Sequence, residues 1–395
     1  ETGGTPCAEN FPPLPPAPPL VINEVHFNPA GGSAFEFIEI ANVDTAAVDL
    51  SGVTVAGVEI TFPGGASIDP GEIIVLAADS ANYGGAYDVY QWTSGDLDDA
   101  GERVALLDSL GQVADEVTYD DEAPWPATAD GGGPSLSLGG TGLDNSLAAN
   151  WGASAYDGGT PGAANWPALP LVITELHYNV NSTLQPGGDD TWEFLEIVNT
   201  GSQAFDLSGY NLFGVVYTFP AGSSIAAGET IVVANLGATY SGAGCTVYDW
   251  TSGGLNGTTE KISLQRFGVD VMSVTYRDSA PWPTAPDGSG PSLSLLATAL
   301  APADGANWAA SPFVGGTPCA ANFPLPPLVI NEIHYNPAAP QAATYEFIEL
   351  INTGTAAVYL GDFTLEGVDF TFPAGTTLAG GGYLVVAAED ANYPG

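Results

Sequence analysis

The chain has 395 residues, 45% of them hydrophobic, so it is long enough to form several domains with cores of their own. Its net charge is -42 although Asp and Glu number only 46, because Lys and Arg together contribute four residues. Such a chain repels phosphate backbones and anionic lipid surfaces, and no apolar run approaches the ~18 residues of a membrane span. We therefore expect neither nucleic-acid partners nor membrane insertion.

Three copies of one stretch organise the sequence: LVINEVHFN at 20–28, LVITELHYN at 171–179 and LVINEIHYN at 328–336. The copies lie too far apart for a solenoid, whose repeats are typically ~20–50 residues, so each marks the start of a separate domain. Each copy alternates strictly and predicts a β-strand with two unlike faces. In the first copy, one face would carry Val21, Asn23, Val25 and Phe27, and the other Ile22, Glu24, His26 and Asn28.

The sequences around these copies predict the domain boundaries. GGTPCAENFP at 3–12 matches GGTPCAANFP at 315–324, which closes a repeat, and dense proline follows it. The last residues align with the middle of the first domain, so we expect the sequence to be a window from a longer array. The predicted segments are the tail of a preceding repeat with a stiff proline-rich linker at 1–19, domains at 20–166 and 167–323, and a linker with a truncated third domain at 324–395.

Short apolar stretches alternate with turns rich in Gly, Pro, Asp and Ser, and no helical period occurs. Many short strands separated by such turns are typical of an antiparallel β-sandwich. The fold class is therefore all-β, with tandem sandwiches joined by proline-rich linkers. In the first domain the predicted strands are Phe35–Asn42, Val53–Phe62, Glu72–Ala78, Arg103–Asp108, Gln112–Tyr119 and Pro134–Leu138.

A set of motifs recurs in the same order: INEVHFNP at 22–29, EFIEIAN at 36–42, FPGG at 62–65, and a final NW followed by GGTP within 150–161. With these motifs the repeats resemble the lamin tail domain, which in bacteria occurs in large secreted or surface proteins, often in tandem. The resemblance implies an immunoglobulin-like β-sandwich and a structural or binding module without catalytic activity. Nuclear lamin tails contact nucleic acid through basic surfaces, which this sequence lacks, so that role is not transferred.

The chain's three histidines each follow a glutamate by two residues in the repeated strand, and these pairs are candidate metal ligands. Positions i and i+2 share a strand face, so each pair could converge on one ion, with Glu36 and Glu39 adding oxygens. Calcium would suit these carboxylates, and also the acidic loops at 96–99, 120–122 and 189–190, although no cofactor is required. We favour the alternative, a Glu–His–Asn hydrogen-bond network that ties the strand to its neighbours. The candidate ligands are Glu24, His26, Glu175, His177, Glu332 and His334.

The cysteines differ between repeats in an informative way. Cys245 and Cys319 both lie in the second domain, where the first domain has Tyr87 and Gly162. Two cysteines that form a bond are expected to be present together or absent together. We therefore predict a Cys245–Cys319 disulfide and an oxidising compartment. The alternative is two independent thiols. Cys7 would pair within the preceding repeat.

No nucleophile elbow, phosphate-binding loop or zinc-binding motif occurs, so we predict no enzymatic activity. Two sequons, at Asn181 and Asn256, are candidate glycosylation sites. We expect an extracellular or cell-surface structural protein that forms a stalk, fibre or filament, with other copies of itself or neighbouring repeats as partners. The alternatives are a calcium-dependent adhesin that binds surface glycans, and an accessory binding module of a larger secreted enzyme.

Overall fold

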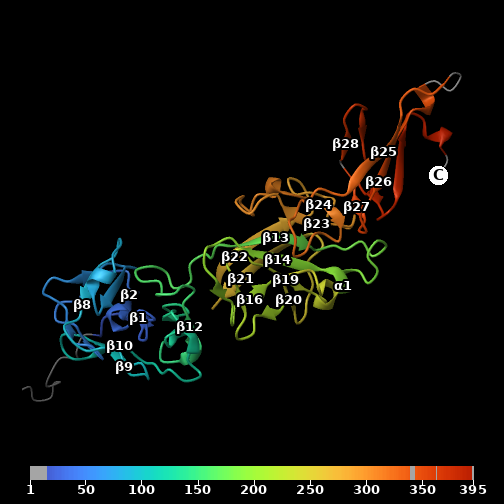
Figure 1. The fold of residues 1–395 in the computed structure, drawn as a ribbon. Coiled ribbons are helices and arrows are strands. Elements are labelled where there is room, and N and C mark those ends of the chain that lie inside the picture. Colours follow the sequence, from blue (N-terminus) through green and yellow to red (C-terminus); the bar gives the residue numbers. More distant parts are fainter. Residues whose placement is uncertain (1–15, 339–342, 362, 394–395) are drawn as a thin grey trace, which may run out of the picture. The chain divides into compact units, whose positions relative to one another are not determined.

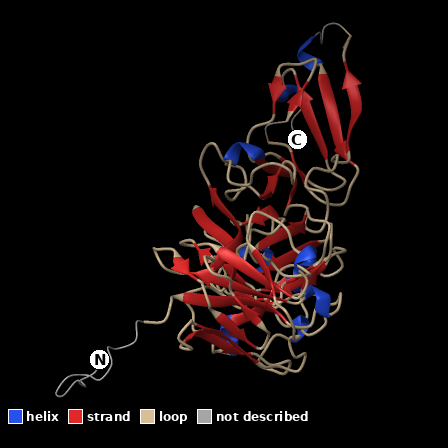
Figure 2. Ribbon diagram, turned by 90° about the vertical axis from the view of Figure 1, so that its left-hand side faces the viewer, coloured by secondary structure: helices blue, strands red, loops and turns tan. Residues whose placement is uncertain are grey.

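The computed structural model describes residues 16–338, 343–361 and 363–393, and strands make up most of their regular structure (Figures 1 and 2). The predicted tail of a preceding repeat, with Cys7, lies outside the described residues. The chain divides into two compact units, residues 1–167 and 168–395, and the second unit contains both the second and the third repeat. Within the described residues, no helix combines the length and apolar character of a membrane span.

Unit 1 is a sandwich of two sheets, in agreement with the predicted immunoglobulin-like fold. One sheet has the order β12-β11-β1-β2-β7-β8 and the other β10-β9-β4-β5, while β3 and β6 form a separate pair. Apolar side chains from both sheets share one core, which includes Ile22, Ile40, Leu106 and Trp151. The strands are β1 (Leu20–His26), β2 (Phe37–Asn42), β3 (Val48–Asp49), β4 (Thr54–Ala56), β5 (Ile60–Thr61), β6 (Ser67–Ile68), β7 (Ile73–Ala77), β8 (Val89–Gln91), β9 (Arg103–Leu107), β10 (Val113–Thr118), β11 (Leu136–Leu138) and β12 (Trp151–Ala153).

The predicted strict alternation of the first strand is wrong, because β1 contains a β-bulge. Its pairing with β2 shifts between Ile22, which faces Ile40, and Glu24, which faces Glu39. The extra residue, Asn23, reverses the sides on which the later residues point. The core therefore receives Leu20, Ile22, Val25 and Phe27. As a result, Asn23 and Glu24 both lie on the outer face of the sheet.

Two further strand predictions need correction. The predicted strand 53–62 is a hairpin, with β4 and β5 joined by a turn at 57–59. The sandwich is also not wholly antiparallel, because β8 pairs with β7 in parallel, as β20 does with β19 in the second repeat. A long connection after β7 lets the chain return in the same direction, which a tight turn would not. The predicted hairpin of 103–108 and 112–119 is confirmed as β9 and β10.

The second repeat has the same sheets at the start of unit 2. One has the order β20-β19-β14-β13-β23-β24, the other β17-β16-β21-β22, and β15 pairs with β18. The short helix α1 (Asp189–Trp192) lies in its longer first loop. The strands are β13 (Leu171–His177), β14 (Phe194–Asn199), β15 (Phe205–Asp206), β16 (Asn211–Phe213), β17 (Tyr217–Thr218), β18 (Ser224–Ile225), β19 (Thr230–Ala234), β20 (Thr246–Asp249), β21 (Thr259–Arg266), β22 (Val269–Arg277), β23 (Pro291–Leu295) and β24 (Trp308–Val314).

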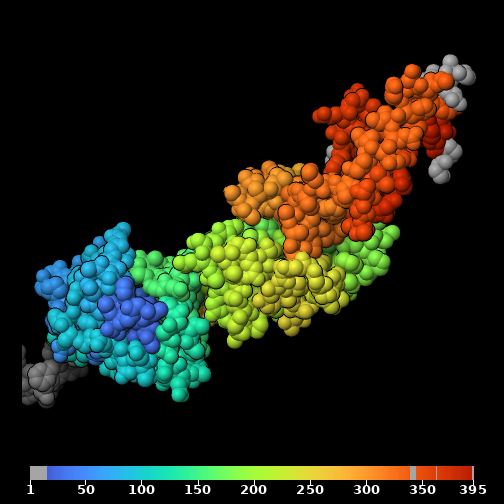
Figure 3. Space-filling view, viewed as in Figure 1, coloured from blue at the N-terminus to red at the C-terminus, as the bar shows by residue number. Residues whose placement is uncertain are grey.

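The third repeat continues a sheet of the second. Its strands β27 and β30 join the edge at β24, which gives an eight-stranded sheet, and atoms of the two repeats touch in Figure 3. Its first strand, β25, pairs with β26 within the described residues and exposes Ile330 and Ile333. The strands are β25 (Leu328–His334), β26 (Phe347–Asn352), β27 (Val358–Tyr359), β28 (Thr364–Leu365), β29 (Phe370–Thr371), β30 (Thr377–Leu378) and β31 (Tyr383–Ala387).

Candidate functional site

The outer face of the β1–β2 sheet holds a buried glutamate bound by the last segment of the same repeat. We call this last segment, residues 158–166 and its counterpart 315–323, the exit segment. The Glu24 carboxylate is fully buried and accepts hydrogen bonds from the Thr160 amide (2.8 Å) and hydroxyl (2.9 Å). The hydroxyls of Ser135 and Ser137 on or beside β11 also donate to it. Burial raises the pKa of Glu24, and these four donors act in the opposite direction.

The contact between the exit segment and Glu24 explains the GGTP motif. A Cβ at Gly159 would lie 2.5 Å from Glu24 Oε1, and its φ of +77° is a conformation that side chains rarely adopt. The second glycine of the motif therefore gives the carboxylate room, and the threonine after it donates both bonds. We call Glu24, Ser135 and Thr160, with their equivalents Glu175, Ser292 and Thr317, the glutamate clasp.

A second buried carboxylate lies beside the first. Glu39 on β2 faces Glu24 across the ladder and accepts hydrogen bonds from the Gly162 amide (2.7 Å) and from Asn23 Nδ2 (2.5 Å). Burial raises its pKa well above the usual range, and the neighbouring negative charge of Glu24 raises it further. Because protein donors surround both carboxylates, the pair binds the chain to itself.

The second repeat builds the same arrangement from its own residues. Glu175 accepts from the Thr317 amide (2.8 Å) and hydroxyl (3.1 Å), and from Ser292 and Ser294. Burial and the charge of Glu196 raise the pKa of Glu175 to about 7. Glu196 accepts from the Thr174 hydroxyl (2.6 Å) and the Cys319 amide (2.8 Å).

The histidines do not join these glutamates. His26 and His177 are buried, and burial lowers the pKa of each to about 4, so both are neutral near pH 7. The His26 ring stands edge-on to Phe37 at 5.5 Å, and His177 Nε2 lies 3.0 Å from Gln185 Oε1. The predicted Glu–His–Asn network is therefore wrong in its members: serine and threonine hydroxyls tie the glutamate to its neighbours, because the bulge and the exit segment bring them closer.

Among the described residues, the fold does not bring the predicted metal ligands together into a cluster. Within the described ranges, no group of three or more His, Cys, Asp and Glu side chains is arranged to hold an ion. In the third repeat Glu332 is exposed and His334 packs against Phe347. In the acidic loops, Asp98 and Asp120 accept backbone amides of their own turns. Metal binding at the six predicted residues stays a prediction.

The structure contains the predicted disulfide. Cys245 and Cys319 are bonded, with Cα atoms 5.4 Å apart, and join the exit segment to the start of β20. In the first repeat the Tyr87 ring fills the corresponding space: a Cβ at Gly162 would lie 2.0 Å from Tyr87 Cδ1. Gly162 and Cys319 both have positive φ, +74° and +65°. A tyrosine packed on a glycine thus replaces the disulfide of the second repeat.

This correspondence predicts a transferable bond. The double variant Tyr87→Cys/Gly162→Cys is expected to form a disulfide in the first repeat, because the backbone there already resembles that of Cys319. Mass spectrometry of non-reduced peptides would detect the link, and either single variant serves as a control with one unpaired thiol. Two free thiols after oxidation of the double variant would contradict the correspondence.

The two sequons differ in their surroundings. Asn181 Nδ2 donates to the Gly288 carbonyl (2.9 Å), so a glycan there would cost a hydrogen bond. Asn256 is exposed, and its Oδ1 accepts from the amide and hydroxyl of Thr258. Asn256 is therefore the more accessible of the two predicted glycosylation sites.

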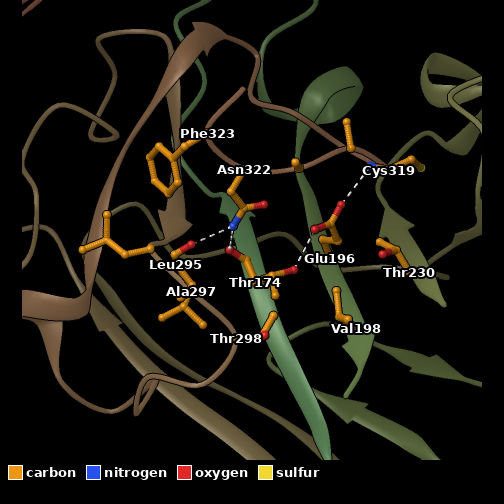
Figure 4. A pocket seen from close by; sticks show the side chains of 13 residues that line it. Thr174, Glu196, Val198, Thr230, Leu295, Ala297, Thr298, Cys319, Asn322 and Phe323 are labelled. Atoms are coloured by element: carbon orange, nitrogen blue, oxygen red, sulfur yellow. Dashed lines mark hydrogen bonds between the residues drawn. The ribbon is translucent and has the colours of Figure 1, made fainter. Parts of the chain in front are cut away.

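An open pocket of about 470 Å³ lies over the outer face of the second repeat, between its sheet and the exit segment. In Figure 4, Phe323 and Leu295 lie on one side, Glu196 and Val198 on the other, and Asn322 and Thr174 between them. The sequence had not indicated this pocket. Comparison of the repeats could have revealed it, because Thr174 and Phe323 of the second repeat replace Asn23 and Trp166 of the first.

Sequence reasoning also missed the serines of the glutamate clasp and the asparagine that ends the second strand. Asn42 Nδ2 donates to the carbonyls of Ala46, Ile68 and Asp69, which holds two turns together. Asn199 and Asn352 make equivalent bonds. The signal was present, because the asparagine and the PSLSL stretch recur at fixed places within the repeats.

Comparison with known proteins agrees with this architecture. A family model described as Lamin Tail Domain matches residues 13–121, 167–278 and 323–393, one segment for each repeat and together more than half of the chain. No curated protein matches the chain. The matched segments contain the bulged first strands, the buried glutamates of β1, β2, β13 and β14, and the asparagines that hold the turns. The chain therefore belongs to the Lamin Tail Domain family and carries three tandem repeats of it.

Proposed function

We propose that this chain is a non-catalytic structural protein of the cell exterior, whose tandem domains form a stalk, fibre or filament. The observation that carries the proposal is the pairing of β24 with β27, through which two consecutive repeats share one sheet. Phe313 of β24 lies opposite Val358 of β27, and the Val314 amide donates to the Ala357 carbonyl at 3.2 Å.

Packing adds to this pairing. The Phe313 side chain packs against the small core of the third repeat, which contains Leu350, Val358 and Leu360. Backbone pairing resists sliding of one repeat past the other, and a shared apolar contact resists their separation. Repeats joined in this way transmit orientation from one to the next, as a stalk requires.

Chemistry supports the exterior location and the absence of catalysis. The Cys245–Cys319 disulfide suits an oxidising compartment, and four Lys and Arg residues in the whole chain leave few sites for trypsin-like proteases. The buried glutamates are enclosed by hydrogen-bond donors of the same repeat, which is the arrangement expected of a structural role.

The variant Phe313→Ser is expected to loosen the junction between the second and third repeats, because it removes the side chain that enters the neighbouring core. Small-angle scattering and negative-stain electron microscopy of single molecules would show a wider range of angles between these two repeats than in the wild type. The control is Phe213→Ser, at a phenylalanine that is 54% exposed. A wild-type protein that already bends freely at this junction would contradict the proposal.

A further inference from the structure

The pocket of the second repeat is a candidate binding site. Its lining combines a carboxylate, an amide and hydroxyls with apolar side chains, and its volume of about 470 Å³ is within the range of small-molecule sites, about 300–1,000 Å³. The sheet contributes Thr174, Glu196, Val198 and Thr230, and the exit segment contributes Asn322 and Phe323.

The first repeat shows how the same place is filled when it is closed. Asn23 Nδ2 donates both to Glu39 Oε1 (2.5 Å) and to Asn165 Oδ1 (3.3 Å), and so lies between the two acceptors. The next residue, Trp166, is buried: it is 6% exposed, and its indole N–H donates to the Leu138 carbonyl at 2.9 Å. In the first repeat, a side-chain nitrogen thus donates to a glutamate oxygen and an asparagine oxygen, and the tryptophan that follows the asparagine is buried.

The second repeat keeps the acceptors and lacks that donor. Thr174 stands in place of Asn23, and its hydroxyl donates to Glu196 alone. Asn322 Nδ2 donates to the carbonyls of Thr174 (2.7 Å) and Leu295 (3.0 Å), while Asn322 Oδ1 accepts no hydrogen bond from any described residue. Phe323, in place of Trp166, is 38% exposed and leaves the pocket open.

The pocket of the second repeat contains hydrogen-bond acceptor positions that no donor among the described residues fills. Each Glu196 oxygen accepts one bond and has capacity for another, Asn322 Oδ1 is free to accept, and the Thr174 oxygen can accept once its proton is donated. No Lys or Arg is among the residues that line the pocket. The site therefore offers several acceptors, among them a carboxylate that is negative when ionised, and a cation with several N–H donors would complement it.

We propose that this pocket binds a primary ammonium group carried on an alkyl stem. The ammonium, with three donors and no acceptor, would replace the Asn23 amide of the first repeat between Glu196 and Asn322 Oδ1. The stem would lie along Val198, Leu295 and the Phe323 ring, as lysine stems lie on apolar surfaces. An anion would be repelled by Glu196, and a neutral alcohol would lack the charge.

The sequence contains one lysine, Lys261, whose ammonium pairs with Asp270, so we expect the ligand to come from another molecule. Two sources carry the same group, a free alkyl amine and the lysine side chain of a partner protein. Cadaverine and Nα-acetyl-lysine methylamide distinguish them, because the second carries a peptide-like backbone at the outer end of the stem. Tighter binding of one of them assigns the source.

The test is a titration of the full ¹⁵N-labelled chain with n-butylammonium, monitored by amide chemical shifts. The controls are 1-butanol, which is isosteric and neutral, and butyrate, which is an anion of similar size. Saturable shifts at the exit segment 315–323 with the amine, and none with the alcohol or the acid, are expected. Equal shifts with 1-butanol, or no shifts with the amine, would overturn the proposal.

Two substitutions test the geometry. Thr174→Asn restores the donor of the first repeat and is expected to weaken amine binding at least tenfold without unfolding, because the first and third repeats have Asn23 and Asn331 at this position. Glu196→Gln removes the charge and is expected to weaken binding similarly. Thr251→Asn, at an exposed threonine outside the pocket, is the matched control. Unchanged amine affinity in Thr174→Asn would overturn the assignment of the site.

Discussion

Removal of the Cys245–Cys319 disulfide is expected to cost the second repeat about 4 kcal/mol of unfolding free energy, because the bond closes a loop between residues 74 apart. The expected loss is a substantial fraction of the ~5–15 kcal/mol by which whole domains are stable. Hydrogen exchange followed by mass spectrometry would report it separately for each repeat. Faster exchange is expected in β19, β20 and the exit segment, with the first repeat unchanged.

The choice of variant matters because Cys319 has a positive φ. Cys245→Ser/Cys319→Gly removes the bond and gives that backbone the residue that Gly162 supplies in the first repeat. The matched variant Cys245→Tyr/Cys319→Gly adds the tyrosine that packs there, and should recover part of the loss. Equal protection of the exit segment in the wild type and in the first variant would contradict a stabilising role for the disulfide.

Raising the pH from 5 to 8.5 is expected to destabilise both complete repeats, because their buried glutamates bind protons more tightly in the folded state. Such groups contribute stability below the unfolded pKa of 4.5 and lose it as the pH rises through their folded values. For Glu175, a folded pKa of about 7 corresponds to about 3 kcal/mol at full ionisation. Burial raises the pKa of Glu24, Glu36, Glu39, Glu175, Glu193 and Glu196.

The histidines act with the opposite sign. The pKa of His26 and His177 falls from 6.5 to about 4 on burial, so their contribution is present above pH 6.5 and is lost as the pH falls through 4. Between pH 4.5 and 6.5, the loss of stability from the six carboxylates with rising pH exceeds the gain from the two histidines. The stability maximum is therefore expected near pH 5, with a decline on both sides.

The variant Glu175→Gln separates this effect from the general repulsion of an acidic chain. At pH 8.5 it should be more stable than the wild type by about 1–3 kcal/mol, whereas at pH 5 the two should be nearly equal. Glu332→Gln is the control, since it removes one charge at the equivalent but exposed position of the third repeat. Denaturant unfolding at both pH values provides the measurement. Destabilisation by Glu175→Gln at both would mean that the ionised carboxylate is the favoured form.

The sequence predicted best those features that depend on comparing one repeat with another. The joint presence of Cys245 and Cys319, against Tyr87 and Gly162, was sufficient to predict the disulfide. The hairpin of β9 and β10 followed from local turn chemistry. Neither inference required knowledge of how distant segments pack.

The bulge of β1 and the pocket of the second repeat could not be predicted from the sequence, because each depends on which residues of other segments lie beside it. The letters of LVINEVHFN alternate, and only the pairing of Ile22 with Ile40 and of Glu24 with Glu39 reveals the extra residue between them. Likewise, the exchange of Asn23 for Thr174 is visible in the sequence. It gains meaning only when Glu39 and Asn165, or Glu196 and Asn322, are seen on either side.

The glutamate clasp also determines where a pulling force would act. Each complete repeat begins at its first strand and ends at an exit segment bonded to that strand. Tension applied to the two ends therefore acts on the bonds between them, which include those of Thr160 to Glu24 and of Thr317 to Glu175. The sheets that contain β9, β10, β21 and β22 lie outside this load path. A stretched repeat would therefore release its exit segment first and lengthen while its core stays folded. In the second repeat the disulfide blocks that extension, so the two repeats would yield at different forces.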